Sequence, residues 1–203
     1  MRNYKIGFEL NHVLRDINKQ VLKYYVKDFD PSFDEDKVNL KDTRHFFENF
    51  DFGGEKSLRK FLYIDYPYEI FGCANTMEKQ LSDKFTVWVQ DLADREDMGL
   101  DVCMFSLGEE ALTIQSSYFF LSKIGCRARE THFPKTNDEV YDKFDIIVTS
   151  DEVLANGTPE GKMAVLITNG QDMEAENSRV ILYESLVEMI EDKDFFKKVE
   201  KYG

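Results

Sequence analysis

Short apolar segments separated by amphipathic ones dominate the sequence. The apolar segments are the expected strands, at Tyr4–Leu10, Leu100–Ser106, Asp145–Thr149, Lys162–Thr168 and Arg179–Leu182, with a weaker one at Arg129–Phe133. A near-continuous apolar run is typical of a strand buried on both faces of a parallel sheet. Because these segments alternate with helical ones, the pattern predicts an α/β fold with helices on both sides of a parallel sheet.

Apolar residues at the helical period predict the helices. The main ones are expected at Val13–Phe29, 76–95, Glu110–Ile124, Asn137–Lys143 and Ser185–Tyr202, with shorter ones at 43–50 and 56–64. Between residues 16 and 99 the pattern predicts no strand. We therefore expect residues 1–15 and 100–203 to form the α/β core, and residues 16–99 to form a helical cap insertion after the first strand.

Composition and charge narrow the classes of function. The 203 residues, 42% of them hydrophobic, suffice for one packed domain with a modest insertion. A formal net charge of −13 disfavours broad contact with nucleic acid, since it repels phosphates. Neither a signal peptide nor a run of about 18 apolar residues is found, so we expect a cytoplasmic protein without membrane contact. The cysteines, Cys73, Cys103 and Cys126, form no CxxC pair, which predicts neither a disulfide framework nor a structural zinc site.

The end of the first predicted strand carries a motif. Residues 8–16 read FELNHVLRD, which resembles hhDxDGVLxD, the first motif of the haloacid dehalogenase superfamily. Glu9 stands at the position of the family's nucleophilic aspartate, Asn11 at that of its acid/base aspartate, and His12 at that of its glycine. The matching positions are Val13, Leu14 and Asp16.

The later motifs are matched in position more than in residue type. Ser106 ends the second core strand, as the family's Ser/Thr motif does, and Lys135 lies where the third-motif lysine is expected. Residues 145–151 (DIIVTSD) resemble the family's DvlIDD, but Thr149-Ser150 replaces the acidic pair and Asp151 follows one position late. The resemblance implies a Rossmannoid three-layer fold with a helical cap, closest to the deoxyribonucleotidase-like branch.

The substitutions affect each part of the chemistry that the resemblance implies. In the family an aspartate attacks phosphorus, and Mg²⁺ is held by that aspartate, by a backbone carbonyl and by a fourth-motif acid. The extra methylene of Glu9 moves its carboxylate by about 1.5 Å, and a misplacement of about 1 Å can cost ~10²-fold in rate. Asn11 cannot exchange a proton as a carboxyl group does. Thr149 and Ser150 are poor ligands for a hard dication. We therefore expect no phosphatase activity, no catalytic residue, no cofactor and no bound metal.

The sequence leaves three functions open. The first is a catalytically inactive structural or protein-interaction subunit of a larger assembly, for which a bacteriophage virion is the specific expectation. The aromatic-rich stretch 46–71 is then the expected interface. The second is a divergent Mg²⁺-dependent 5′-nucleotidase or phosphatase that uses Glu9 and Asp151. The third is a small-ligand module that holds nucleotide or phosphate through Ser106 and Lys135.

Each of these positions also has an ordinary structural interpretation. Glu9 reads as a solvated or hydrogen-bonded residue at a strand end. Ser106 reads as a cap at the start of the following helix, and Lys135 as a surface lysine. The aromatic stretch reads as packing within the insertion.

Overall fold

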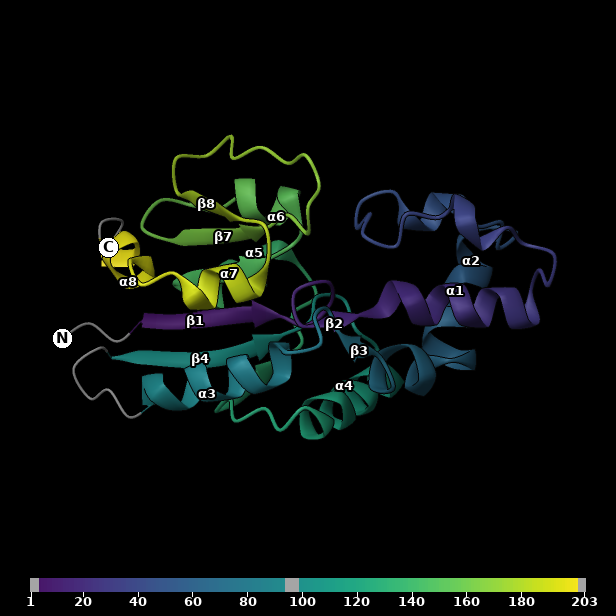
Figure 1. Ribbon diagram of the computed structural model, residues 1–203, viewed down its shortest axis with the longest axis horizontal. Helices are drawn as coiled ribbons and strands as arrows, with labels where there is room; N and C mark the ends of the chain where they lie inside the picture. Colours follow the sequence, from purple (N-terminus) through teal and green to yellow (C-terminus); the bar gives the residue numbers. More distant parts are fainter. Residues whose placement is uncertain (1–3, 94–98, 201–203) are drawn as a thin grey trace.

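The computed structural model describes residues 4–93 and 99–200, and its main feature is a parallel sheet (Figure 1). Six strands lie in the order β5-β4-β1-β6-β7-β8, and each pairs in parallel with its neighbours. The strands are β1 (Tyr4–Glu9), β4 (Leu100–Phe105), β5 (Glu130–His132), β6 (Ile146–Thr149), β7 (Met163–Ile167) and β8 (Val180–Tyr183). The predicted α/β fold class with a parallel sheet is confirmed.

Alternating residues of β1 pack into two different helical layers. Phe8 contacts Phe85 and Trp88 of α3 (Leu81–Ala93), with ring centroids 5.1 and 5.7 Å apart. Gly7 faces the opposite layer, where a Cβ atom would lie 2.7 Å from the ring of Phe144. That close approach is the physical reason for a glycine in the middle of this strand.

The two layers are built from helices of the second half of the chain, together with α3. On the side of Phe8, α3 packs beside α7 (Leu186–Glu191), and Trp88 stacks on Phe196 of α8 (Phe195–Glu200). On the other side, α5 (Asn137–Lys143) and α6 (Glu152–Asn156) contribute Val140 and Leu154 to one buried cluster. The sheet is therefore the middle of three layers, as the parallel-strand pattern predicts.

A mainly helical insertion lies beyond the carboxyl ends of β1 and β4 (Figure 1). At its base, β2 (Arg15–Asp16) and β3 (Asn75–Thr76) pair in antiparallel fashion. Its helical segments are α1 (Ile17–Asp28), α2 (Glu55–Lys60), the short 3₁₀ turns η1 (Glu35–Lys37) and η2 (Phe46–Asn49), and the π-helical turns η3 (Phe61–Asp65) and η4 (Tyr68–Gly72). The range 16–99 that the sequence assigns to the insertion also contains α3, which packs on the sheet.

Several predicted helix bounds differ from the structure. The helix expected at 13–29 begins only at residue 17, because residues 15–16 pair with 75–76 instead, and that pairing also delays the helix expected from 76. The expected C-terminal helix is divided at Asp192, whose backbone is extended and whose carboxylate accepts bonds from Tyr183 and Lys198. α6 was not predicted, whereas α4 (Ala111–Lys123) lies where a helix was expected. Residues 94–95 and 201–202 of the predicted helices lie outside the described residues.

The aromatic residues of the insertion form its own core. Tyr25 packs against the rings of Phe33, Phe50 and Phe52, with centroids 5.3, 4.8 and 5.0 Å away. Phe46, Phe61 and Phe71 are also buried. Contacts inside the insertion therefore bury most aromatic residues of the stretch 46–71, as the packing interpretation predicts, and only its exposed aromatic residues remain available to a partner. Tyr68, at 47% exposed, is the clear exception.

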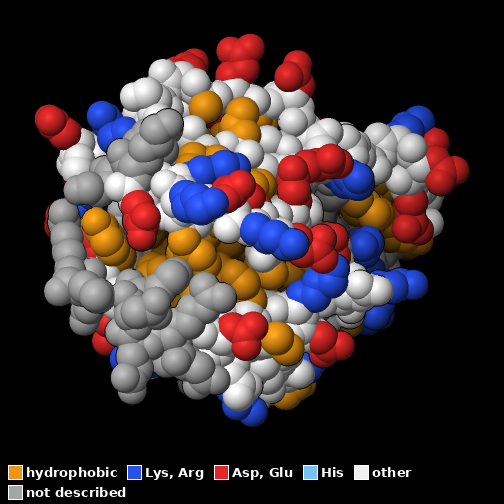
Figure 2. Space-filling model, turned by 60° about the vertical axis from the view of Figure 1, so that its left-hand side comes forward, with side chains coloured by type: hydrophobic (Ala, Val, Ile, Leu, Met, Phe, Trp, Pro, Cys, Tyr) orange, Lys and Arg blue, Asp and Glu red, His pale blue; other side chains and the backbone are white. Residues whose placement is uncertain are grey.

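Charged side chains of both signs mix on the molecular surface. On the face in Figure 2, Lys and Arg lie next to Asp and Glu, with hydrophobic side chains visible between them. The net charge of −13 is therefore not spread on this face as a uniform acidic field. In the described part of the chain, no helix has the length and apolar character that a membrane span requires.

Candidate functional site

The carboxyl ends of the central strands open into a cavity beneath the insertion. β1 lies between β4 and β6, so the strands predicted to end at Leu10, Ser106 and Thr149 are neighbours in the sheet. The cavity has a volume of about 510 Å³. The core side of its lining is Glu9, Asn11, His12, Ser150, Asp151, Glu152 and Val153, and the insertion side is Ile17, Thr43, Arg44, Phe47, Leu62, Tyr63 and Phe71.

Glu9 ends β1 as a buried carboxylate with two hydrogen-bond donors. Thr149 donates through Oγ1 at 2.5 Å, and the backbone N–H of Ser150 donates at 3.4 Å, both to Glu9 Oε2. Burial raises the pKa of Glu9 to about 7; the bond from Thr149 opposes this rise, and the nearby charge of Asp151 adds to it. Near neutral pH the side chain is therefore neutral in a large share of molecules, which weakens it as a nucleophile or metal ligand.

Asp151 is committed to the start of the next helix. Its Oδ1 accepts the backbone N–H groups of Val153 at 2.8 Å and Leu154 at 3.1 Å, which makes it the N-cap of α6. Magnesium prefers several carboxylate or water oxygens in octahedral geometry. Here the carboxylates already hold protein donors, and their neighbours Thr149 and Ser150 are neutral. The chemistry of these residues does not fit a Mg²⁺ site.

The backbone conformation of His12 explains why the family motif has a glycine at this position. Its φ is +62°, in the left-handed region that side chains disfavour. In this conformation the His12 N–H donates to the carbonyl of Arg15 at 2.9 Å, and Asn169 donates to the His12 carbonyl at 2.9 Å. Burial lowers the pKa of His12 to about 4, so the ring is neutral at pH 7. Its Nδ1 has no hydrogen-bond partner within the described residues.

Arg15 is the largest fully buried side chain of the described chain, and it lies beside these motif residues. A guanidinium has five N–H donors. All five are used. Nε donates to Asn11 Oδ1 at 2.7 Å, and Nη1 donates to Ser117 Oγ at 2.6 Å and to the Phe71 carbonyl at 3.3 Å. Nη2 donates to Ser106 Oγ at 3.4 Å and to the carboxylate of Glu109. None is left to hold the oxygens of a phosphate.

Glu109 neutralises this buried charge and organises its surroundings. Its carboxylate forms the ion pair with Arg15 and lies 2.8 Å from Ser117 Oγ through each oxygen. Its backbone carbonyl accepts a hydrogen bond from Lys135 Nζ. Lys135 and Ser106 therefore meet the Arg15–Glu109 pair and do not line the cavity. Ser106 is not a helix cap either, since Glu110 is the N-cap of α4.

The structure thus divides the motif residues into two groups. Glu9, Ser150 and Asp151 line the cavity, with Thr149 hydrogen-bonded to Glu9, whereas Ser106 and Lys135 contact the Arg15–Glu109 pair; Asn11 belongs to both groups, since it lines the cavity and accepts a hydrogen bond from Arg15. Sequence reasoning missed both Arg15 and Glu109. A signal existed for the arginine, because a charged residue stands between Leu14 and Asp16, two positions that match the family motif. No comparable signal marked Glu109, which reads as one of two acidic residues before a helix.

Comparisons with solved structures agree with this architecture. The chain is similar to YfnB from Bacillus subtilis, described as a HAD-hydrolase bound to magnesium, with a TM-score of 0.57 at 11% identity over 93% of this chain and 97% of that chain. It is also similar to a haloacid dehalogenase-like hydrolase from Burkholderia xenovorans, with a TM-score of 0.55 at 11% identity over 95% of this chain and 97% of that chain. A dehalogenase has a TM-score of 0.54 at 12% identity over 92% of this chain and 95% of that chain.

Sequence comparison adds nothing to these structural similarities. No protein-family model matches the chain, and no curated protein matches it. At 11–12% identity the structural similarities establish the fold alone. Together with the parallel sheet, the strand-end cavity and the helical insertion, they show that this chain has the fold of the haloacid-dehalogenase-type hydrolases.

Proposed function

We propose that this protein is a haloacid-dehalogenase-type fold without phosphatase activity, which serves as a structural or protein-interaction subunit. The observation that carries the proposal is the buried Arg15–Glu109 pair. Arg15 holds Asn11 and Ser106, the residues at the acid/base and Ser/Thr positions of the family motifs, and its donors are all used inside the protein. A phosphoryl-transfer site needs such donors free to stabilise the charge of the transferring group.

The state of Glu9 supports the same proposal. Attack on phosphorus requires an ionised carboxylate aligned with the bond that breaks. Burial raises the pKa of Glu9 to about 7, and both of its donors bind the same oxygen, Oε2. Its environment therefore favours a hydrogen-bonded structural role at the strand end.

An exposed apolar patch supports the interaction role. Tyr68 of η4 lies against Phe119 of α4, with ring centroids 5.0 Å apart, and Leu112 lies two turns before Phe119 on the same face of α4. These side chains are 47%, 42% and 48% exposed, respectively. Aromatic residues are enriched at the centres of protein interfaces. The proposed partner at this patch is another protein subunit; the placement in a bacteriophage particle and in the deoxyribonucleotidase-like branch are predictions from sequence alone.

An assay of phosphatase activity tests the catalytic half of the proposal. The purified chain is incubated with Mg²⁺ and a panel of nucleoside monophosphates, beside the Glu9→Gln variant. We expect no release of phosphate above the Glu9→Gln background. Turnover by the natural chain that is lost both in Glu9→Gln and after chelation of Mg²⁺ would refute the proposal.

Association measurements test the second part of the proposal, the protein-interaction role. The chain is mixed with extract from its native source, and the size of its complexes is measured by light scattering after purification. Phe119→Glu should abolish a co-purifying complex, because it places a charge in the patch. Val87→Glu is the matched control, since Val87 is 58% exposed on α3, whereas the patch lies on η4 and α4. Equal effects of the two variants would contradict the assignment of the patch.

The alternative function is a Mg²⁺-dependent nucleotidase that uses Glu9 and Asp151. Two observations favour it: both residues line a cavity of about 510 Å³, and the similar YfnB is described as bound to magnesium. It requires Glu9 to ionise and Asp151 to bind the ion through Oδ2, since its Oδ1 caps α6. The phosphatase assay separates the two functions, since only the nucleotidase releases phosphate in a way that depends on Glu9.

A further inference from the structure

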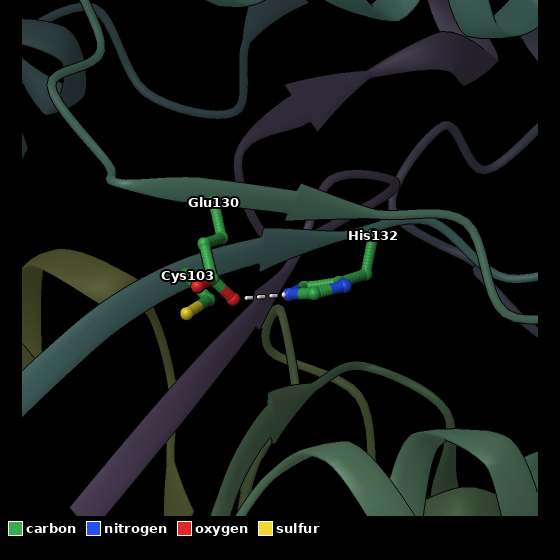
Figure 3. A group of neighbouring side chains, drawn as sticks. All are labelled: Cys103, Glu130 and His132. Carbon is green, nitrogen blue, oxygen red and sulfur yellow. Dashed lines mark hydrogen bonds and ion pairs between the residues drawn. The ribbon is translucent and has the colours of Figure 1, made fainter.

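Three side chains able to bind a metal ion lie together on β4 and β5 (Figure 3), and none of them lines the cavity. Cys103 of β4 is the register partner of Glu130 on β5, and His132 follows two residues later. Because side chains alternate along a strand, Glu130 and His132 project from the same face. The candidate ligand atoms, a thiol sulfur, a carboxylate oxygen and an imidazole nitrogen, all lie within 4.8 Å of one another.

We propose that Cys103, Glu130 and His132 form a binding site for a divalent transition metal ion, with Zn²⁺ as its occupant. Sulfur, nitrogen and oxygen donors together suit this ion, whereas Mg²⁺ and Ca²⁺ prefer oxygen alone. Bonds of about 2.0–2.3 Å in a tetrahedral site place ligand atoms about 3.3–3.6 Å apart. The candidate ligand atoms, which lie at most 4.8 Å apart, must come somewhat closer together to reach this spacing. Three protein ligands leave the fourth position to water or to a further ligand.

The hydrogen bonding of the cluster shows how an ion enters it. His132 Nε2 and Glu130 Oε2 lie 2.9 Å apart and are joined by one hydrogen-bonded proton. A metal ion takes the place of that proton, and the thiol of Cys103 releases its own proton on binding. The side chains of His132 and Glu130 are 23% and 48% exposed, so they are open to solvent, while Cys103 forms the buried floor.

Lys5 competes with a metal ion for the carboxylate of Glu130. From the neighbouring strand β1, its Nζ donates to Glu130 Oε2 at 2.8 Å. An incoming cation must share the carboxylate with this ammonium or displace it. The other charged pair nearby is Arg129 with Asp101, at 3.0 Å, and it is complete without the cluster. Removal of the Lys5 charge is therefore expected to strengthen metal binding, which a purely structural role of the cluster does not predict.

Such an ion would cross-link the edge strand β5 to β4. β5 has three residues and ends the sheet beside β4. A bond from Cys103 on β4 to two side chains of β5 adds a cross-link where the backbone ladder is short. The ligands come from separate strands, so the sequence lacks the close cysteine spacing by which zinc sites are recognised, and the cysteine pattern predicted none.

Metal titrations of the full chain test the proposal. The protein is first treated with a chelator, and Zn²⁺ affinity is then measured by competition with a chromophoric chelator, while Co²⁺ reports thiolate ligation by its near-ultraviolet charge-transfer absorption. We expect one ion per chain, and a rise in Tm of about 5–10 °C at a Zn²⁺ concentration of about 100 Kd. Lys5→Met should tighten binding several-fold.

Matched variants identify the ligands. Cys103→Ser and His132→Gln should each weaken Zn²⁺ binding by about tenfold or more, and Cys103→Ser should also remove the Co²⁺ charge-transfer band. Cys126→Ser is the control, because Cys126 lies outside the cluster, and it should leave both readouts unchanged. An unchanged band and affinity in Cys103→Ser, or an equal loss in Cys126→Ser, would overturn the site. If Cys103→Ser does not fold, His132→Gln at the exposed edge decides the question by affinity.

Discussion

Replacing Glu109 by glutamine tests how much the buried Arg15–Glu109 ion pair contributes to the stability of the fold. The variant keeps the shape of the side chain but removes its charge, and Arg15, 0% exposed, is left without its counter-ion. Breaking a buried pair by removing one partner costs about 3–5 kcal/mol. Because glutamine keeps one acceptor oxygen, we expect the lower end, about 3 kcal/mol. For a chain of this size that corresponds to a fall in Tm of about 6–12 °C.

The neighbouring residue provides the control. Glu110 forms an ion pair with Arg59, but both side chains are substantially exposed, at 42% and 56%. Surface pairs of this kind contribute about 0–1 kcal/mol. Urea unfolding of Glu109→Gln and Glu110→Gln, followed by circular dichroism, compares the two directly. A loss in Glu109→Gln no larger than that in Glu110→Gln would refute the reasoning.

A double substitution sharpens the test. Arg15→Met alone leaves Glu109 buried and unpaired, and should also be strongly destabilising. Arg15→Met combined with Glu109→Leu replaces both charges by apolar groups of similar volume, which is often neutral or stabilising. The double variant should therefore be more stable than either single variant, with a coupling free energy of about 2 kcal/mol or more. Additive losses would show that the two residues act independently.

Two further outcomes concern the strand end and the sheet. The pKa of Glu9 is raised from 4.5 to about 7 in the folded state, so between these pH values the folded protein binds a proton that the unfolded chain does not. The stabilisation from protonated Glu9 is therefore full below about pH 4.5 and is lost as the pH rises through about 7. The free energy of unfolding of the natural chain relative to Glu9→Gln should therefore fall by about 3 kcal/mol from pH 4.5 to 8; a constant difference would contradict it. Gly7→Ala should cost about 1–3 kcal/mol in urea unfolding by overpacking against Phe144, and Phe144→Leu should recover part of that loss; no recovery would place the strain elsewhere.

The fold was accessible from the sequence because its signals are local. Each apolar run reports a strand buried on two faces, and residues 145–149 and 162–168 were found in this way with bounds close to those of β6 and β7. The motif at residues 8–16 then marked the end of the first strand as part of the candidate site. The predicted bounds failed where a distant partner intervened, as at residues 15–16, whose pairing with 75–76 delays two helices.

The candidate site was accessible only in part. The positions of Glu9, Thr149 and Asp151 follow from the motif and from the rule that parallel strands expose their carboxyl ends together. The protonation of Glu9 and the hydrogen bonding of Asp151 do not follow from the motif. The pKa of Glu9 is raised by burial in the folded protein, and Asp151 caps α6, a helix that was not predicted. The tertiary contacts decided what these residues can do.

The sequence alone determined the order of the core strands and of most helices, and the absence of the motif acids, because periodicity and residue identity are recorded along the chain itself. Only the tertiary structure placed Glu109 against Arg15, 94 positions away, and Cys103 against Glu130 and His132. Both groupings depend on which strands and loops become neighbours. That choice is made by the burial of apolar surface over the whole molecule, and the polar groups that must pair inside it leave no periodic trace in the sequence.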